Sequence, residues 1–308
     1  MTRWLAATVL GCTLAPTALA VEGLEWNWEG QERRYLLRTD VQLPEVMWVN
    51  SEVGRESRVV GFALDVVTTC VGTEPAGRKG YNVTCTLEDL TIIFDESPSA
   101  PGVLAPFAQE LDGLYTGKPV ELVVKNDGRI TSFEVQGLDE TNRRINQVHQ
   151  PFREMLRRAF ATLEVRLPRR GSDGGAGTWR EVGTMAMQLP STTGTMGRAN
   201  VVWTVDSAED GMVSMSSAAE GIIGTGEMIN DRPKNQYNMQ MTGLGVFDVG
   251  QHALVRQAYV VTGLNTASSQ LGEQGSNVGY RQRSEAKLIP AAARVELPES
   301  GERLHSLD

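Results

Sequence analysis

The second half of the chain carries a succession of β-strand patterns with no helical pattern between them. The runs lie between residues 178 and 290, and turn-forming pieces such as SAEDG and NDRPKN separate them. They read TWREVGTMAMQL, RANVVWTVD, GMVSMSSAAEGII, QYNMQMTGLGVFDV, ALVRQAYVVTG and NVGYRQRSEAKLI. Strands that follow one another without a crossover helix pair antiparallel, so the pattern predicts an antiparallel meander.

Strand patterns also occupy the first half of the chain. Apolar side chains alternate from Arg34 to Leu43, as expected of a strand with one buried face. In PVELVVKNDGRITSFEV, the residues Asn126, Asp127 and Gly128 separate two β-rich runs. Because these residue types adopt the positive φ angles that a tight turn requires, the sequence predicts a hairpin here.

Two of the three cysteines, Cys70 and Cys85, stand on either side of a turn-rich segment. A strand pattern runs from Val60 to Cys70 before the segment, and another from Tyr81 to Leu87 after it. Each cysteine lies on the side of its strand that carries the apolar residues. Metal binding would require further ligands, the three histidines are far apart in the sequence, and a redox couple would typically have the Cys-x-x-Cys spacing. We therefore predict a structural disulfide that clamps the base of a hairpin with a long tip, from Gly72 to Gly80.

The N-terminal segment 1–20 has the layout of a signal peptide. MTRWLAATVLGCTLAPTALA contains one arginine, a short apolar run and a small-x-small site that ends at Ala20. The apolar run is too short to cross a bilayer as a helix. The sequence therefore predicts export to the periplasm or the cell exterior. As an alternative, the residues from Val9 to Cys12 resemble a lipobox, in which Cys12 would carry a lipid anchor.

Charge and hydropathy narrow the class of protein further. The net charge of −9 becomes −10 in the mature chain, because the signal contains one charged residue, Arg3. An acidic chain of this kind argues against a nucleic-acid partner. The sequence has no second long apolar segment, so no transmembrane helix is predicted in the mature chain. We expect one β-rich domain from 21 to 290, or alternatively two halves that meet near 168–178, followed by a flexible tail at 291–308.

One amphipathic helix is predicted within NRRINQVHQPFREMLRRAFATLE. Its apolar residues recur at helical spacing and form a stripe along one face. The stripe consists of Phe152, Met155, Leu156, Ala159, Phe160 and Leu163. Pro151 is expected either to begin this helix or to separate it from a shorter preceding one. Two interpretations remain open: the stripe packs as core against the concave face of a sheet, or it forms a movable lid over an apolar pocket.

The same region is basic within an otherwise acidic chain. Eight arginines and two glutamates lie between Arg143 and Arg170. The candidate contacts to anionic headgroups or an acidic partner are Arg153, Arg157, Arg158, Arg169 and Arg170. The alternative is a solvated helix face, whose late arginines also suit the dipole at the helix C-terminus.

Catalytic motifs are absent from the sequence. It contains no Gly-x-Ser-x-Gly elbow, no His-Glu-x-x-His pair and no phosphate-binding Gly-Lys-Ser/Thr loop. Pairing of Cys70 with Cys85 would leave the mature chain without a free thiol. We therefore expect a protein that is not an enzyme and that uses neither a cofactor nor a metal ion.

The order of the predicted elements carries a resemblance. Strands, the GKPVELVVKNDGRITSFEV hairpin, an amphipathic helix, a Trp-bearing strand at GTWREV and a long meander follow one another. This layout, from Arg34 to Pro290, resembles secreted and periplasmic bacterial β-rich proteins of the curved-sheet type. At fold level it is similar to periplasmic lipoprotein carriers and lipid-binding half-barrels.

The resemblance implies a mainly β fold, with a curved antiparallel sheet or incomplete β-barrel and an amphipathic helix on its concave face. It also implies an exported cell-envelope protein that binds a hydrophobic ligand, such as a lipid, or a lipid-bearing envelope partner. The alternative is a structural or interaction protein of the envelope with a filled core and no ligand.

Overall fold

The computed structural model describes residues 24–50, 56–75, 80–96, 105–138, 143–167, 177–189, 192–229, 232–265 and 280–297. The predicted signal segment with Cys12, the candidate arginines Arg169 and Arg170, and the end of the predicted tail lie outside these residues. In the described part of the chain, neither helix is long and apolar enough to span a bilayer.

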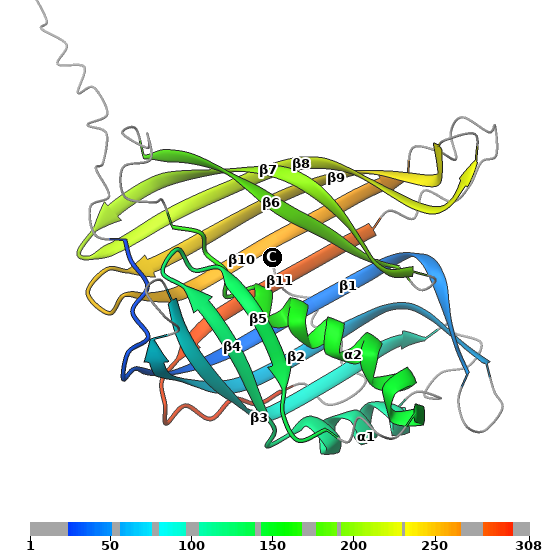
Figure 1. Ribbon diagram of the computed structural model, residues 1–308, viewed down its shortest axis with the longest axis horizontal. Helices are drawn as coiled ribbons and strands as arrows, with labels where there is room; N and C mark the ends of the chain where they lie inside the picture. The colour runs from blue at the N-terminus through cyan, green and yellow to red at the C-terminus, as the bar shows by residue number, and fades with distance from the viewer. Residues whose placement is uncertain are drawn as a thin grey trace, which may run out of the picture.

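The described residues form one antiparallel sheet of eleven strands and two helices (Figure 1). The strands are β1 (Glu32–Asn50), β2 (Glu56–Pro75), β3 (Gly80–Glu96), β4 (Pro119–Lys125), β5 (Ile130–Val135), β6 (Thr178–Leu189), β7 (Thr192–Glu209), β8 (Met212–Ile229), β9 (Arg232–Asp248), β10 (Ala253–Asn265) and β11 (Tyr280–Ile289). The helices are α1 (Ala105–Tyr115) and α2 (Arg143–Ala161). Across the sheet the strand order is β5-β4-β3-β2-β1-β11-β10-β9-β8-β7-β6. The predicted meander is confirmed as β6 to β11.

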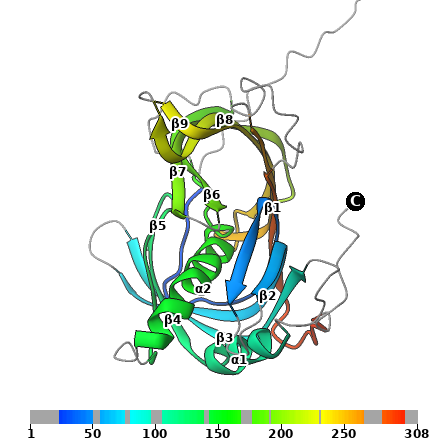
Figure 2. The ribbon, with the colours of Figure 1, turned by 90° about the vertical axis from the view of Figure 1, so that its right-hand side faces the viewer.

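The sheet is open and curved. β5 and β6 are its two edges, and the described residues contain no pairing between them. Figure 2 shows the sheet in cross-section as an arch, with α2 inside it and α1 near its base. Alternate side chains of each strand point into the arch, among them the fully buried Leu37, Val66 and Met215. This architecture confirms the predicted curved sheet or incomplete barrel with a helix on its concave face.

The strands on either side of residues 168–176 belong to the same sheet. β1 pairs with β2 on one side and with β11 on the other, so that Thr39 lies opposite both Leu64 and Ser284. Beyond β11, Ala293 of the predicted tail accepts a hydrogen bond from Nη1 of Arg34 on β1, at 2.5 Å. The first strand therefore joins the N-terminal strands to the meander.

The predicted disulfide between Cys70 and Cys85 is confirmed. The two residues lie opposite each other on β2 and β3, and both are fully buried. The predicted long hairpin tip is wrong, because both strands continue well beyond the cysteines. Gly72, which the sequence pattern placed in the tip, belongs to β2, and a Cβ there would lie 1.8 Å from the carbonyl oxygen of Trp28. Glycine is needed at this position for a close backbone approach rather than for a turn.

The predicted hairpin at Asn126, Asp127 and Gly128 is confirmed as the connection between β4 and β5. Gly128 has a φ of +84°, and its N–H donates to the carbonyl oxygen of Lys125 at 2.8 Å. A Cβ on Gly128 would also lie 2.0 Å from the carbonyl oxygen of Val165. Both the turn and the neighbouring backbone therefore require glycine here.

The helices differ from expectation in two respects. Pro151 lies inside α2, which runs without interruption from Arg143 to Ala161, so the expected helix start or break at this proline is wrong. Proline within a helix removes one backbone hydrogen bond, and burial of the apolar stripe on the following turns offsets that cost. No sequence pattern predicted α1. Its buried residues Ala108, Leu111 and Tyr115 form only a short repeat at helical spacing, and they follow a segment whose residues are typical of turns.

One end of the arch is closed by the N-terminal segment and by the segment that follows α2. The indole N–H of Trp26 donates to the carbonyl oxygen of Val165 at 3.2 Å. The backbone N–H of Leu167 donates to the carbonyl oxygen of Asp127 at 3.0 Å. The ring of Trp26 packs edge-on against Phe247, with the centroids 5.4 Å apart. These contacts fix the C-terminal end of α2 against the β4–β5 turn and the end of β9.

Asp65 is a buried carboxyl group on the outer face of β2, opposite Arg38 of β1. The Arg38 Nε lies 3.6 Å from its carboxylate. Burial raises the pKa of Asp65 from 3.8 to about 6; the charge of Arg38 lowers it in part, and Asp40 and Glu285 raise it. The folded protein therefore binds a proton at Asp65 more tightly than the unfolded chain does.

We expect Asp65→Asn to flatten the pH dependence of stability between about pH 4 and pH 6. Because the folded pKa lies above the unfolded one, the contribution of Asp65 to the free energy of unfolding falls as the pH rises through this window. The variant should therefore be more stable at pH 7 by about 1 to 2 kcal/mol, measured by urea unfolding at several pH values. Glu121→Gln, which removes an exposed charge of β4 that is not among those shifting the pKa of Asp65, is the control. Parallel pH profiles for wild type and Asp65→Asn would contradict this prediction.

Candidate functional site

A row of small and polar residues crosses the middle of the inner face of the sheet. The strand registers place Thr39 of β1, Ser284 of β11, Tyr259 of β10, Gly243 of β9 and Ser217 of β8 side by side. We call this set the polar row. Buried hydroxyl groups need hydrogen-bond partners, so the row marks where polar contacts are organised on the concave face.

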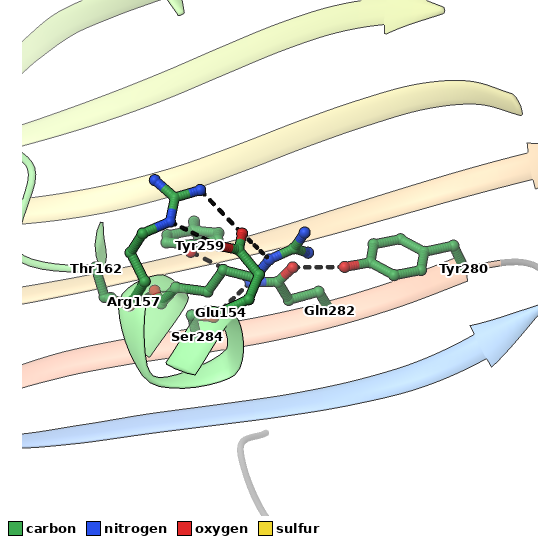
Figure 3. A network of polar contacts seen from close by, with 8 residues as sticks. Glu154, Arg157, Thr162, Tyr259, Tyr280, Gln282 and Ser284 are labelled. Carbon is green, nitrogen blue, oxygen red and sulfur yellow. Dashed lines mark hydrogen bonds and ion pairs between the residues drawn. The ribbon is translucent and has the colours of Figure 1, made fainter. Parts of the chain in front are cut away.

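The side chains of β1, β10 and β11 form a hydrogen-bond network along the polar row, and Figure 3 shows its members on β10 and β11. The Tyr280 hydroxyl donates to Oε1 of Gln282 at 2.6 Å, and Nε2 of Gln282 donates to Oγ of Ser284 at 3.0 Å. The same Nε2 donates to the Tyr259 hydroxyl at 3.3 Å, and Ser284 Oγ lies 3.3 Å from Oγ1 of Thr39. Burial raises the pKa of Tyr259, so its hydroxyl remains protonated at neutral pH.

Mostly apolar rows flank the polar row on both sides. The row toward the closed end consists of Leu37, Ala286, Gln257, Gly245 and Met215. The row toward the other end consists of Val41, Gln282, Val261, Met241 and Ala219. The inner face therefore combines mostly apolar side chains with a polar band, which Gln257 and Gln282 of the flanking rows widen on β10 and β11.

α2 presents a polar flank to this band. Successive residues of a helix are turned by about 100°, which places Arg158 and Thr162 beside one edge of the apolar stripe, with Phe160 at its opposite edge. The Tyr259 hydroxyl accepts a hydrogen bond from Nε2 of Gln282 at 3.3 Å, and Ser284, Thr162 and the charge of Arg158 lower the pKa of this hydroxyl against the effect of burial. The flank of α2 that carries Arg158 and Thr162 thus faces β10 and β11, and Figure 3 shows Thr162 beside Tyr259 and Ser284.

Glu154 links two arginines of α2. Arg157 donates to its carboxylate from Nε at 2.8 Å and from Nη2 at 2.9 Å, and Arg158 donates from Nε at 3.2 Å. Burial by itself raises the pKa of Glu154, but the hydrogen bonds and charges of the two arginines lower it below its ordinary value. The carboxylate therefore stays ionised and holds both guanidinium groups.

The predicted apolar stripe of α2 is buried along its length. Its five candidate residues are Phe152, Met155, Leu156, Phe160 and Leu163. Phe152 packs against Tyr115 of α1, with ring centroids 4.5 Å apart, and Phe160 against Phe133 of β5, at 5.6 Å. α2 also lies over β1 and β2. The stripe therefore faces α1, β1, β2 and β5, whereas the polar flank faces β10 and β11.

The three described candidate arginines occupy different environments. Arg157 is exposed, Arg153 is half-buried, and Arg158 keeps only 7% of its surface accessible. Helical periodicity places all three outside the apolar stripe, but the curved sheet wraps round one flank of α2 and buries Arg158. A pattern of polar residues along a helix carries no information about that wrapping.

Sequence patterns did not identify the polar row. The residues Tyr280, Gln282 and Ser284 share one parity of β11 with Ala286, and such polar residues on a buried parity are the signal that was available. In YRQRSEAKLI both parities carry polar residues, however, so the inward parity could not be chosen. The register with β1 and β10 decides it.

The side chains around the row offer hydroxyl, amide and guanidinium groups. Within the described part of the chain, no group of three or more His, Cys, Asp or Glu side chains is arranged to hold a metal ion. The arrangement supplies hydrogen bonds and one buried cation to whatever lies against the inner face.

The fold and the inner face define a class of protein: a mainly β protein whose open, curved sheet encloses an amphipathic helix. No family model and no curated protein matches the chain. Among solved structures it is similar to one described as "Lipid-protein interactions in lipovitellin", with a TM-score of 0.48 and 14% sequence identity. The match covers 87% of this chain and 26% of that chain, so this chain spans about a quarter of its length. This is a weak likeness of fold.

Proposed function

We propose that this protein is an exported, non-enzymatic protein of the cell envelope that binds a hydrophobic ligand, or a lipid-bearing partner, inside the arch. The observation that carries the proposal is the inner face of β8 to β11, where apolar rows lie on both sides of a single polar row. A surface of this kind suits a ligand with a long apolar part and one polar group.

The apolar wall continues beyond the strands that α2 covers. α2 lies over β1, β2 and β5, and Figure 2 shows β7, β8 and β9 arching above it. Inward-facing side chains of these three strands include Trp203, Met215, Ile223, Tyr237 and Met239. Contact with such a wall would stabilise an apolar ligand by about 25 cal/mol for each Å² removed from water.

Two observations support export. The layout of residues 1–20 is that of a signal peptide. The Cys70–Cys85 disulfide is typical of oxidising compartments such as the periplasm or the cell exterior.

The chemistry of the polar row suits the binding of a ligand. Its described hydrogen bonds join hydroxyl and amide groups. Direct contacts of hydroxyl and amide groups suit recognition of a ligand's polar group.

The alternative is a structural or interaction protein of the envelope whose core is filled by its own side chains. The contacts of Phe152 with Tyr115 and of Phe160 with Phe133 favour it, because they leave the stripe of α2 fully occupied by protein. In that case the polar row would only tether α2 to the sheet.

Native mass spectrometry of the protein purified from its own host separates the two functions. We expect an apolar ligand to co-purify, and delipidated protein to take up added lipid. Ala219 faces inward on β8, whereas its neighbour Ala218 is exposed. Ala219→Phe should reduce ligand uptake, and Ala218→Phe, the same change on the opposite face, should leave it unchanged.

The alternative predicts a different result for the same pair of variants. If no ligand co-purifies and none binds on addition, the binding function is wrong. Ala219→Phe would then act only by overpacking the core, which typically costs about 1 to 3 kcal/mol of stability.

A further inference from the structure

Arg158 is a buried cation with unused hydrogen-bonding capacity. Its Nε donates to Glu154, but Nη1 and Nη2 are buried and have no hydrogen-bond partner among the described residues. A guanidinium carries five N–H donors and no acceptor, so these two nitrogens can be satisfied only by acceptor atoms. Thr162 follows Arg158 by one helical turn and donates to its carbonyl oxygen at 3.5 Å, and Figure 3 shows Thr162 beside Tyr259 and Ser284 of the polar row.

The charge of Arg158 is not balanced by its described neighbours. Glu154, the carboxylate that it touches, is already held by two shorter hydrogen bonds from Arg157. The next carboxylate, Glu164, lies 3.9 Å from Arg166 and accepts a hydrogen bond from the backbone N–H of Ile130. Two arginines therefore share Glu154; the charge of Glu164 also acts on Arg157, whereas Arg158 has one 3.2 Å contact with Glu154 and two nitrogens without a partner among the described residues.

An uncompensated buried charge is costly, because the surrounding protein replaces water poorly. The cost is removed if an anion brings acceptor oxygens to the two free nitrogens of the guanidinium. Carboxylate and phosphate groups match the planar fork of arginine with paired hydrogen bonds. The hydroxyl groups of Tyr259 and Thr162 lie on the same side of α2 and can add neutral hydrogen bonds.

We propose that Arg158 binds the anionic headgroup of the ligand, so that the ligand is an acyl amphiphile with a carboxylate or phosphate group rather than a neutral lipid. This inference rests on the proposed function. The headgroup lies between α2 and the polar row, and the acyl chain lies along the apolar rows of β8 to β10. Arg158 is thus a specificity-determining residue of the site.

A pair of fluorescent probes that differ only in charge tests the proposal. cis-Parinaric acid carries a carboxylate, and its methyl ester is neutral. Charge-assisted hydrogen bonds typically contribute a factor of about 10 to 100 in affinity, so wild-type protein should bind the acid more tightly than the ester by about that factor. Arg158→Gln should bind the acid as weakly as the ester and should retain its affinity for the ester.

Arg180→Gln is the control, because it removes an exposed arginine of β6 and leaves Glu154 with both of its arginines. This variant should keep the preference for the acid. Competition of the bound acid by oleate and by a monoacyl glycerol phosphate separates the two headgroup sources: the stronger competitor identifies carboxylate or phosphate as the group that Arg158 binds.

Four outcomes would overturn the proposal, each in a distinct way. Equal affinity of wild type for acid and ester removes the role of Arg158 and leaves the proposed function intact, whereas binding of neither probe removes both. A preference for the acid that persists in Arg158→Gln assigns headgroup recognition elsewhere. The melting temperature of ligand-free Arg158→Met tests separately whether Arg158 has a structural role. We expect it to equal or exceed that of wild type. A fall of about 5 °C or more would show that Arg158 is a structural ion-pair partner instead.

Discussion

Gly128→Ala is expected to lower the free energy of unfolding by about 3 to 5 kcal/mol. Gly128 has a φ of +84° in the β4–β5 turn, a conformation that costs an alanine about 1 kcal/mol. An added Cβ would also lie 2.0 Å from the carbonyl oxygen of Val165 and 2.3 Å from Nε1 of Trp26. The added methyl group therefore has to break the hydrogen bond between these two residues.

The effect should be large because this contact closes one end of the arch. Val165 lies in the segment that follows α2, and Trp26 belongs to the N-terminal segment that packs against Phe247 at the end of β9. Displacement of the backbone at Val165 would loosen α2, the turn and β9 together. Urea unfolding followed by tryptophan fluorescence and circular dichroism measures the loss.

Gly211→Ala is the matched control. Gly211 also has a positive φ, of +78°, but no other atom lies within 4 Å of the position that its Cβ would take. This variant should lose only the conformational cost, about 1 kcal/mol. Similar losses in the two variants would show that the backbone around Gly128 moves freely, and that the closed end contributes little to stability.

Phe160→Ala is expected to lower the free energy of unfolding by about 3 to 5 kcal/mol. The Phe160 side chain is fully buried on α2 and packs against Phe133 of β5. Truncation to alanine removes the buried ring and leaves a cavity that the curved sheet and the helix can fill only in part. Phe160→Leu, which keeps most of the volume, should lose much less.

This experiment also decides between the two interpretations of the apolar stripe. If α2 were a lid that spends much of its time away from the sheet, Phe160→Ala would cost less than about 1 kcal/mol, because little ring burial would be lost. Arg157→Ala, at an exposed position of the same helix, controls for helix propensity and should change stability by less than about 0.5 kcal/mol. A full loss for Phe160→Ala assigns the stripe to the permanent core and leaves the opposite flank of α2 for the ligand.

Local patterns predicted much of the fold, and their failures have identifiable causes. The Asn126-Asp127-Gly128 turn and the parity of Cys70 and Cys85 depend on neighbours along the chain, so the sequence was sufficient for them. Beyond Cys85, β3 pairs with β4, and beyond Cys70 the backbone of Trp28 approaches Gly72 of β2 closely. That contact arises from a distant segment, and no local pattern announces it.

The strand-rich class, the hairpins, the disulfide and the amphipathic stripe of α2 are predictable from alternation, turn chemistry or helical spacing over a few residues. The side of β11 that faces inward and the flank of α2 that the sheet covers depend on long-range contacts. Both follow from the pairing of β11 with β1 and β10 and from the curvature of the whole sheet. They bring Arg158 next to Tyr259 and Ser284, and they turn one of several arginines in a basic run into a buried cation.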